Sequence, residues 1–306
     1  MFGLTSQPLG PHNKHVSSIT SRDLSIMSHT HSSAAAIPEP SLVPIQGLHC
    51  GHYFYRWKRD VLASMGQDFV HHAKSDFLAA ISPNASDRTE RIQSFIISGH
   101  KADFATIMMD LNPLKVDRIH QRMMGSKLGA AIEPVYSFVS MSEISEYLPN
   151  KEQYAAKLIR TGEDPASATF QAKVASYEKR LPSMFAQRIA PEFPNWPAMC
   201  FYPMNKARNV GANWFLQPFS ARTEMMAEHA QSGMAFAGRV TQLVTASVGL
   251  DDWEWGVTLW AKNPQYLKEI VYTMRYDSAS AHFGQFGSFY TGYLASGADI
   301  LEHCVV

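Results

Sequence analysis

The stretch QSFIISGHKADFATIMMDL (residues 93–111) contains two apolar runs, Gln93–Ser98 and Asp103–Leu111, each as long as a typical β-strand. Only residues 99–102 (GHKA) separate them. A glycine-led segment of four residues is a loop of hairpin size, so we predict that the two runs pair as antiparallel strands. The rest of the first half is assigned outward from this hairpin.

A helix and a strand are predicted on each side of the hairpin. Before it, Lys58–Ile81 carries apolar side chains at helical spacing, and Leu48–Arg56 (LHCGHYFYR) is aromatic and strand-like. After it, Pro113 can open a helix over Leu114–Leu128, and Val135–Ile144 (VYSFVSMSEI) has the pattern of another strand. The resulting order, β-α-β-β-α-β, is that of a ferredoxin-like unit.

The same order of elements returns in the second half of the chain. Strands are predicted at Met199–Asn205, Val240–Ser247, Trp255–Ala261 and His282–Tyr293, and helices at Pro218–Gln231 and Pro264–Tyr276. We therefore expect the α+β class, with tandem ferredoxin-like repeats that form a dimeric α+β barrel with helices outside. Two independent α+β domains are the alternative that this pattern leaves open.

Three segments of the chain follow from this repeat. The N-terminal ferredoxin-like half is predicted at residues 46–148 and the C-terminal half at residues 198–306, with a connector at residues 149–197. The connector is helical by pattern at Lys151–Arg160 and Phe170–Arg180 and then rich in proline. A connector of this length suggests more than a spacer.

The first forty residues differ in composition from the rest. They are rich in Ser, Thr and His and poor in large apolar side chains, so burial cannot offset their ordering entropy. No apolar block follows Lys14 or Arg22, as a signal peptide would require. We expect residues 1–45 to be a disordered or extended tail, with Met27 as an alternative start. Its histidines offer only weak metal binding: His12, His15, His29 and His31.

Composition excludes several classes of function. The chain of 306 residues has 27 Lys plus Arg and 27 Asp plus Glu, so it lacks the excess positive charge of a non-specific nucleic-acid binder or a polybasic membrane anchor. No run of 18 apolar residues occurs, so stable membrane insertion is not expected. Three cysteines (Cys50, Cys200 and Cys304) fit a reducing compartment, and we expect a cytoplasmic protein.

Generic catalytic motifs are absent from the sequence, including the GxSxG elbow, the P-loop, the dinucleotide-binding glycines and HExxH. The carboxylates Asp251, Asp252 and Glu254 fall in a predicted hairpin turn. Tyr202 and Lys206 are more informative, because a spacing of four places both on one face of a strand. They can handle protons or electrons there, or they are a core tyrosine and a snorkelling lysine.

A histidine and two arginines are further candidates in the second half. His229 lies near a predicted helix C-terminus among Met225, Met226 and Met234, where a neutral imidazole suits an axial haem ligand or a core-edge histidine. The arginines Arg188 and Arg275, with the hydroxyl of Ser280, suit carboxylate binding, although each alone is also an ordinary surface residue.

Three blocks of sequence resemble the coproheme decarboxylase branch of the chlorite dismutase-like family. They are YPMNK (202–206), SVGLDDWEWG (247–256) and MRYD (274–277), the last followed by FGQFG (283–287). The resemblance is strong over residues 199–294 and extends more weakly to about residue 48. It implies a tandem ferredoxin-like barrel, usually pentameric, with one haem site in the C-terminal half.

The resemblance also implies an activity. The family's decarboxylases bind iron-coproporphyrin III (coproheme) and convert two propionates to vinyl groups with hydrogen peroxide, yielding haem b and carbon dioxide. A transient coproporphyrin ferrochelatase partner is a further expectation. Because coproheme carries four carboxylates, its pocket must pair those charges.

Roles are carried over residue by residue. His229 is expected to bind the iron, Tyr202 to form the radical that takes an electron and a proton from the propionate, and Lys206 to assist decarboxylation by binding the second propionate and supplying a proton. The substrate-binding positions are expected at Arg188, Met204, Arg275 and Ser280, and Met204 shares the pocket wall with Trp214.

Gln242 discriminates within the family. It matches the residue above the iron, where true chlorite dismutases carry an arginine that acts on the chlorine oxyanion. Glutamine lacks that charge, which favours decarboxylation. The alternatives are a chlorite dismutase or peroxidase-like haem enzyme, and a non-catalytic haem carrier or sensor. The sequence departs from the family pattern at Ala207, His282 and Gln285, where basic residues and a glutamate are common.

Overall fold

The protein is described by a computed structural model over residues 40–82, 84 and 88–306, in which Leu42–Val306 form one compact unit. The expectations for residues 1–39, among them the tail histidines and the start at Met27, lie outside the described residues.

The described residues contain one large antiparallel sheet that closes into a barrel. Its order is β10-β5-β11-β2-β3-β1-β4-β8-β9, and β9 also pairs with β5, which closes the ring. The strands are β1 (His49–Trp57), β2 (Arg91–Ile97), β3 (Phe104–Asp110), β4 (Ile132–Ser142), β5 (Ala198–Lys206), β8 (Val240–Ala246), β9 (Trp255–Ala261), β10 (Gly284–Phe286) and β11 (Tyr290–Leu294).

The two halves of the chain build the barrel in the same way. The first contributes β2-β3-β1-β4 and the second β8-β9-β5-β11, which is the same permutation of strands. The halves meet at two seams, where β4 pairs with β8 through Met141 and Ser142, and β11 pairs with β2. The predicted tandem ferredoxin-like barrel is therefore confirmed. The alternative of two independent domains is wrong, because one sheet contains the strands of both halves.

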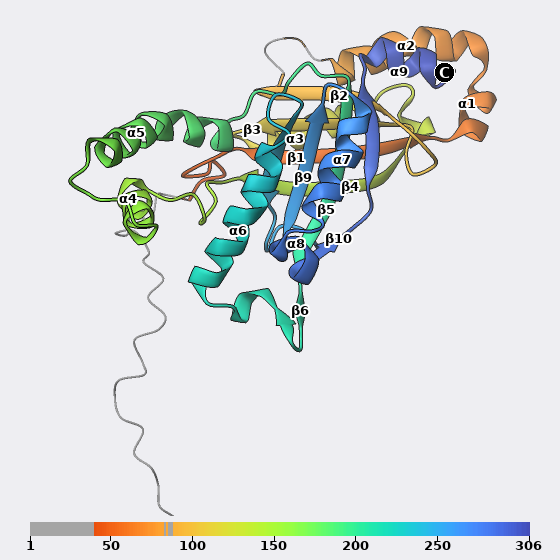
Figure 1. Cartoon of the computed structure of the whole chain (residues 1–306). Coiled ribbons are helices and arrows are strands. Elements are labelled where there is room, and N and C mark those ends of the chain that lie inside the picture. Colours follow the sequence, from red (N-terminus) through yellow and green to blue (C-terminus); the bar gives the residue numbers. More distant parts are fainter. Residues whose placement is uncertain (1–39, 83, 85–87) are drawn as a thin grey trace, which may run out of the picture. The chain divides into compact units, whose positions relative to one another are not determined.

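Helices cover the outside of the barrel in two groups (Figure 1). Those against the first half are α1 (Arg59–Met65), α2 (Gln67–Ile81), α3 (Pro113–Met124) and α9 (Gly297–His303), with the short η1 (Gly129–Ala131). Those of the second half are α6 (Phe219–Met234), α7 (Pro264–Met274) and α8 (Ser278–Phe283). A small hairpin of β6 (Arg208–Asn209) and β7 (Ala212–Asn213), followed by η2 (Trp214–Leu216), precedes α6.

Local sequence explains where several helices start. The side chain of Asn112 caps α3 and that of Asn263 caps α7, and each cap is followed by a proline at the start of the helix. The predicted helix Lys58–Ile81 is instead divided into α1 and α2 at Gly66, which adopts φ 77.

The sheet has an apolar layer on each side. Phe201 and Trp260 belong to the core inside the barrel. On the outer side, Tyr202 belongs to a cluster that α7 completes with Leu267 and Ile270. Because successive side chains of a strand point to opposite faces, β5 supplies both layers.

The last predicted strand, His282–Tyr293, is wrong in its first part. Its first two residues belong to α8, which the side chain of Asp277 caps, and the rest forms two short strands, β10 and β11, that both pair with β5. The break between them includes Gly287, where a Cβ would lie 2.6 Å from the side chain of Pro203. The prediction rested on the alternation of apolar residues. It did not take into account the cap at Asp277 or the close approach of Gly287 to Pro203.

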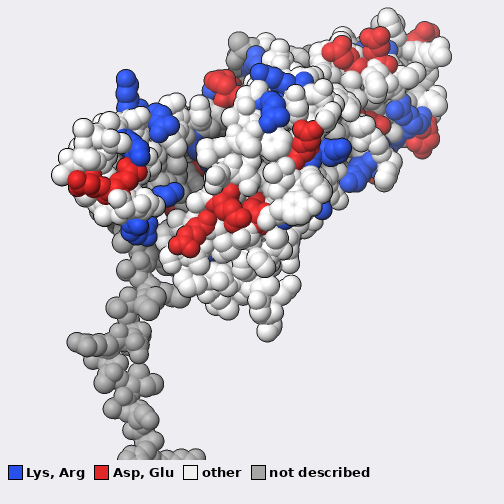
Figure 2. Space-filling view, viewed as in Figure 1, with Lys and Arg blue, Asp and Glu red and all other residues white. Residues whose placement is uncertain are grey.

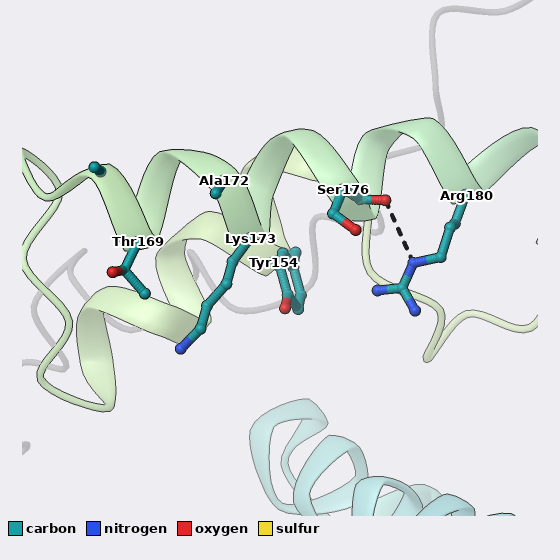
Figure 3. Close-up of a pocket in the computed structure, with 7 residues that line it drawn as sticks. Tyr154, Thr169, Ala172, Lys173, Ser176 and Arg180 are labelled. Atoms are coloured by element: carbon teal, nitrogen blue, oxygen red, sulfur yellow. Dashed lines mark hydrogen bonds between the residues drawn. The ribbon is translucent and has the colours of Figure 1, made fainter.

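The connector folds as a helical hairpin of α4 (Lys151–Arg160) and α5 (Ala168–Ile189). The first helix is as predicted, but α5 extends well past Arg180 and includes Pro182, the first proline of the part that was predicted to be proline-rich. Tyr154 and Tyr177 stack between the two helices with ring centroids 4.0 Å apart. A hollow of about 540 Å³ lies beside this hairpin, and none of the predicted site residues lines it. Figure 3 shows the residues that do.

Candidate functional site

Three predicted site residues alternate along the outer face of β5. This strand pairs with β9 without interruption from Ala198 to Met204, so Tyr202, Met204 and Lys206 share one face. Phe201, which lies between them in the alternation, packs inside the barrel. The strand therefore presents a phenol and an ammonium on one wall, from Cα atoms about 13 Å apart along the strand.

The Tyr202 ring is clamped by two phenylalanines. Phe289 stacks on it at 4.5 Å, and Phe286 meets it edge-on at 5.7 Å. The residue is 8% exposed, and burial raises the pKa of its phenol well above the ordinary value. The hydroxyl accepts or donates no hydrogen bond within the described part of the chain. A neutral, oriented phenol without a protein partner is free to meet a ligand.

Lys206 is buried among aromatic and backbone groups. Its Nζ donates to the carbonyl oxygen of Ala279 in α8 at 3.2 Å and lies 4.5 Å from the ring centroid of Trp214. Burial lowers the pKa of Lys206 to about 8, with the charge of Asp277 opposing the shift. This ammonium can release and regain a proton near neutral pH. Trp214, predicted as pocket wall, therefore packs against the ammonium of Lys206.

His229 is paired with a buried carboxylate. Its Nδ1 lies 2.8 Å from Oδ2 of Asp277, a residue that is 2% exposed and caps α8. A neutral imidazole that donates from Nδ1 to a carboxylate has its Nε2 lone pair available, which is the arrangement typical of metal-binding histidines.

Ser280 belongs to the same cluster. Its Oγ lies 3.3 Å from Oδ2 of Asp277 and 3.4 Å from Nδ1 of His229. The hydroxyl expected to hold a propionate thus faces the histidine–aspartate pair in this structure. Asp277 itself was missed as a site residue, although an aspartate before Ser-Ala-Ser is a recognisable helix cap.

The donor set around His229 suits a porphyrin better than a bare ion. Residues 40–82, 84 and 88–306 contain no cluster of three or more His, Cys, Asp or Glu side chains that could hold a metal. One imidazole supplies a single ligand, so an iron bound here must bring its own equatorial ligands, as a porphyrin does. The helix that carries His229, α6, buries none of its 16 residues, which is unusual for a helix beside a sheet.

Gln242 lies on the same side of the sheet as Tyr202. It pairs with Leu259 of β9, which in turn pairs with Cys200 of β5, and both neighbours belong to the outer cluster. Two strand spacings, about 10 Å, therefore separate Gln242 from β5. Its side chain is exposed, so it can meet a ligand held over this face.

The two predicted arginines lie at the ends of two different helices. Arg275 follows α7, and Arg188 lies in the last turn of α5, next to Ile189, whose carbonyl accepts a hydrogen bond from Ser142 at the β4–β8 seam. Both are exposed, and neither makes an ion pair with a described residue. Their guanidinium groups remain available for anions, but the structure does not bring Arg188 into contact with the other site residues.

The carboxylates of the DDWEWG block have structural partners. Asp251 accepts a hydrogen bond from the backbone N–H of Val139 at 2.9 Å, and Glu254 binds backbone and guanidinium groups at the end of β5. Among the departures from the family pattern, Ala207 is buried, whereas His282 and Gln285 are exposed.

Charge is unevenly distributed around α6. Figure 2 shows acidic side chains gathered over this helix, where Glu224 and Glu228 are exposed. A hollow of about 350 Å³ lies beside them, lined by residues of α6 and by residues at and after the end of α7: Glu228, Ser232, Tyr272, Thr273, Tyr276 and Asp277. The negative charge of Glu228 and Asp277 disfavours an anion in this hollow.

Known proteins resemble this chain over most of its length. The coproheme decarboxylase of Staphylococcus carnosus (strain TM300) is 35% identical over 219 residues, which are 72% of this chain and 79% of the relative. The coproheme decarboxylase of Staphylococcus saprophyticus subsp. saprophyticus (strain ATCC 15305) is 36% identical over 200 residues, 65% of this chain and 71% of the relative. A solved structure described as a novel heme-binding protein from Thermus thermophilus superposes with a TM-score of 0.69 at 25% identity, covering 88% of this chain and 100% of that one.

In the described part of the chain no helix has the length and apolar character needed to cross a membrane.

A match to a known protein family covers every strand of the barrel except β1. The family described as chlorite dismutase matches residues 70–295, which run from α2 to the end of β11 and include every predicted site residue. With this match and relatives above 30% identity, the chain belongs to the chlorite dismutase family.

Proposed function

We propose that this chain is a coproheme decarboxylase, which uses hydrogen peroxide to convert two propionates of iron-coproporphyrin III to vinyl groups and yields haem b. Both relatives carry that name. The observation that carries the proposal is the wall of β5, where Tyr202 and Lys206 share one face and α8 links Lys206 to the His229–Asp277 pair.

The chemistry balances with one peroxide for each propionate. A propionic acid group and one hydrogen peroxide become a vinyl group, one carbon dioxide and two waters. The bound iron porphyrin, with peroxide, supplies the oxidising power. The residues of this chain bind the porphyrin, orient its propionates and move protons and electrons at its edge.

Tyr202 is proposed to act on the propionate to be oxidised. Its phenol would lose an electron and a proton to the oxidant and regain both from the propionate side chain. The resulting carbon radical would lose a second electron to the oxidant, which releases carbon dioxide and leaves the vinyl group. The stacked Phe289 and the edge-on Phe286 hold the ring in one orientation and exclude water from it. The hydroxyl has no competing hydrogen-bond partner among the described residues.

Lys206 is proposed to bind the second propionate and to supply a proton. Its lowered pKa allows both protonation states near neutral pH. His229 is proposed to bind the iron through Nε2, while Asp277 fixes the imidazole by accepting from Nδ1. Arg188, Arg275 and Ser280 are proposed to meet the remaining carboxylates, Met204 and Trp214 to form the wall, and Gln242 to lie above the iron.

The wider setting is also proposed. We infer a cytoplasmic homo-oligomer, a pentamer by resemblance to the family, that receives coproheme from a coproporphyrin ferrochelatase. The chain is divided into the tail 1–45, the halves 46–148 and 198–306, and the connector 149–197. Analytical ultracentrifugation of the purified chain tests the oligomeric state.

One experiment separates the candidate activities. Purified protein is loaded with coproheme, titrated with hydrogen peroxide and sampled by chromatography. A decarboxylase gives a three-propionate intermediate followed by haem b. Unchanged coproheme would contradict the proposal and leave a carrier or sensor, whereas rapid oxygen release from chlorite would favour a chlorite dismutase.

A further inference from the structure

The backbone pairing between β5 and β9 ends two residues before Lys206. Its last pair joins Met204 to Trp255. Beyond it, side chains replace backbone pairing: Oδ1 of Asn205 accepts from the N–H of Glu254 at 2.7 Å. An oxygen of the Glu254 carboxylate, Oε2, accepts from the backbone N–H of Lys206 at 3.1 Å. These two hydrogen bonds thus connect the YPMNK block to the DDWEWG block.

Glu254 is itself fixed in place. It is 7% exposed, and its other oxygen, Oε1, accepts from the guanidinium of Arg208. The backbone carbonyl of Glu254 accepts from the N–H of Ser247 at 2.8 Å. Arg208 in turn lies over the ring of Phe215 at 5.0 Å. A buried carboxylate with these partners is a rigid anchor, because moving it would leave a charge unpaired.

The two edges of β5 hold Lys206 differently. On one edge, Lys206 pairs with Gly284 of β10, and the N–H of Ala207 donates to the carbonyl of Phe283 at 2.8 Å. On the other edge, the Glu254 carboxylate is the group that meets the lysine's N–H. The side chain leaves from this point and reaches the carbonyl of Ala279. A shift of the backbone at Lys206 therefore displaces Nζ.

We propose that Glu254 is a positioning residue for the decarboxylation: its carboxylate fixes the end of β5 so that Nζ of Lys206 meets the second propionate. This inference rests on the proposed function for its chemical consequence. Its geometric part concerns only residues of this chain, and it assigns a role to the most buried carboxylate of the DDWEWG block.

The groups that face Lys206 come from separate elements. Asp277 approaches from the start of α8 and favours the ammonium, and Trp214 covers it from η2. The negative charge of Glu254 is balanced by Arg208. A substitution of Glu254 is therefore expected to act mainly by moving Lys206, and less by changing the field at its Nζ.

The experiment compares three variants of the full-length chain. Glu254→Ala removes both acceptor oxygens. Glu254→Gln keeps one acceptor for the N–H of Lys206. Asp252→Asn, an exposed residue of the same turn, is the control for loss of a charge. Each variant is loaded with coproheme and titrated with hydrogen peroxide, and the rates of both decarboxylations are measured.

Glu254→Ala is expected to bind coproheme as the parent does and to make the three-propionate intermediate, but to lose about 10- to 100-fold in the second step. Glu254→Gln is expected to restore most of that rate, and Asp252→Asn to change nothing. Equal loss in both steps, or no loss in the second, would overturn the proposal. A failure of Glu254→Gln to improve on Glu254→Ala would overturn it as well.

A measurement without turnover separates this inference from the proposed function. Lysines are reductively methylated with ¹³C-formaldehyde, and the signal missing in Lys206→Arg identifies Lys206. Its NMR titration midpoint is expected near 8 in the parent and closer to the ordinary 10.5 in Glu254→Ala, because a displaced Nζ gains water. An unchanged midpoint contradicts the inference. A moved midpoint in a chain that leaves coproheme unchanged contradicts only the proposed function.

Discussion

At the scale of one residue, removing the Tyr202 hydroxyl tests the proposed role of this tyrosine in the first decarboxylation. Tyr202→Phe keeps the ring between Phe286 and Phe289 and removes only an oxygen that has no partner among the described residues. Folding and coproheme binding should therefore be preserved. Because the phenolic proton is lost, the first decarboxylation should slow by at least about 100-fold. Chromatography after peroxide addition measures this, and normal turnover would refute the tyrosine mechanism.

A substitution of Asp277 tests whether its partner His229 binds the iron. Asp277→Asn removes the charge that orients His229 and should weaken coproheme binding by about 10- to 100-fold, the usual effect of losing the partner of a metal-binding histidine. Absorbance titration with coproheme measures the affinity. Glu302→Gln, an exposed carboxylate of α9 in the other group of helices, is the control and should bind as the parent does. Equal affinities for Asp277→Asn and the parent would refute the role of the pair.

Lys206 connects function to stability. Its pKa is about 8 in the folded chain and 10.5 ordinarily. Below pH 8 the lysine is protonated in both states, and the fold bears the full cost of a buried charge. Between pH 8 and 10.5 the folded state loses its proton first, so stability rises with pH. Above 10.5 the cost is gone.

Replacing Lys206 by an apolar residue should therefore stabilise the fold, although it removes the amine that the proposed reaction needs. Lys206→Met is expected to raise the free energy of unfolding by about 1–3 kcal/mol at pH 7 and by much less at pH 10. Urea unfolding of both proteins at the two pH values measures the difference. Lys157→Met, at an exposed position of α4, is the control. A variant less stable than the parent at pH 7 would contradict the burial argument.

Residue-level prediction from sequence worked where spacing alone determines geometry. A separation of four along a strand placed Tyr202 and Lys206 on one face, as found. The partner of His229 could not be predicted from the sequence, because Asp277 is 48 positions away in the chain and contacts it only in the folded protein. The phenylalanines beside Tyr202 were missed for a related reason, since they come from a strand that breaks.

At the scale of elements, α6 should respond most to ligand. This helix buries none of its residues, whereas α2 buries four, Ala73, Phe77, Ala80 and Ile81. A porphyrin between α6 and the sheet would cover its inner side. Coproheme should therefore slow amide hydrogen exchange in α6 by more than about tenfold and leave α2 unchanged. Mass spectrometry of peptic peptides measures both, and unchanged exchange in α6 would contradict the proposed location.

Element prediction succeeded where local chemistry is strong. The proline after Asn263 marked the start of α7, and the boundaries of β9 and α4 were predicted as found. It failed where tertiary contacts override pattern. The aromatic stretch after His282 divides because Gly287 must pack against Pro203, and that contact leaves no periodic signal. The continuation of α5 through the exposed Pro182 has no such explanation in the structure.

At the scale of the whole molecule, the order of helices and strands along the chain predicted the fold. Two copies of β-α-β-β-α-β predicted the barrel without any sequence similarity between the halves, because each half must cover its sheet on both sides. The order could not reveal how the halves meet. The seams contain two and three residue pairs, compared with nine between β1 and β4. Such short contacts leave little pattern in a sequence.

The seams also set an order of events during synthesis. The first half leaves the ribosome with β2 and β4 as open sheet edges, which invite pairing with other chains. Their partners, β8 and β11, are made much later, and the pair of Ile97 with Gly292 spans almost 200 residues. The nascent chain must therefore shield two edges until translation is nearly complete, so its solubility in the cell should depend on chaperones that hold incomplete sheets.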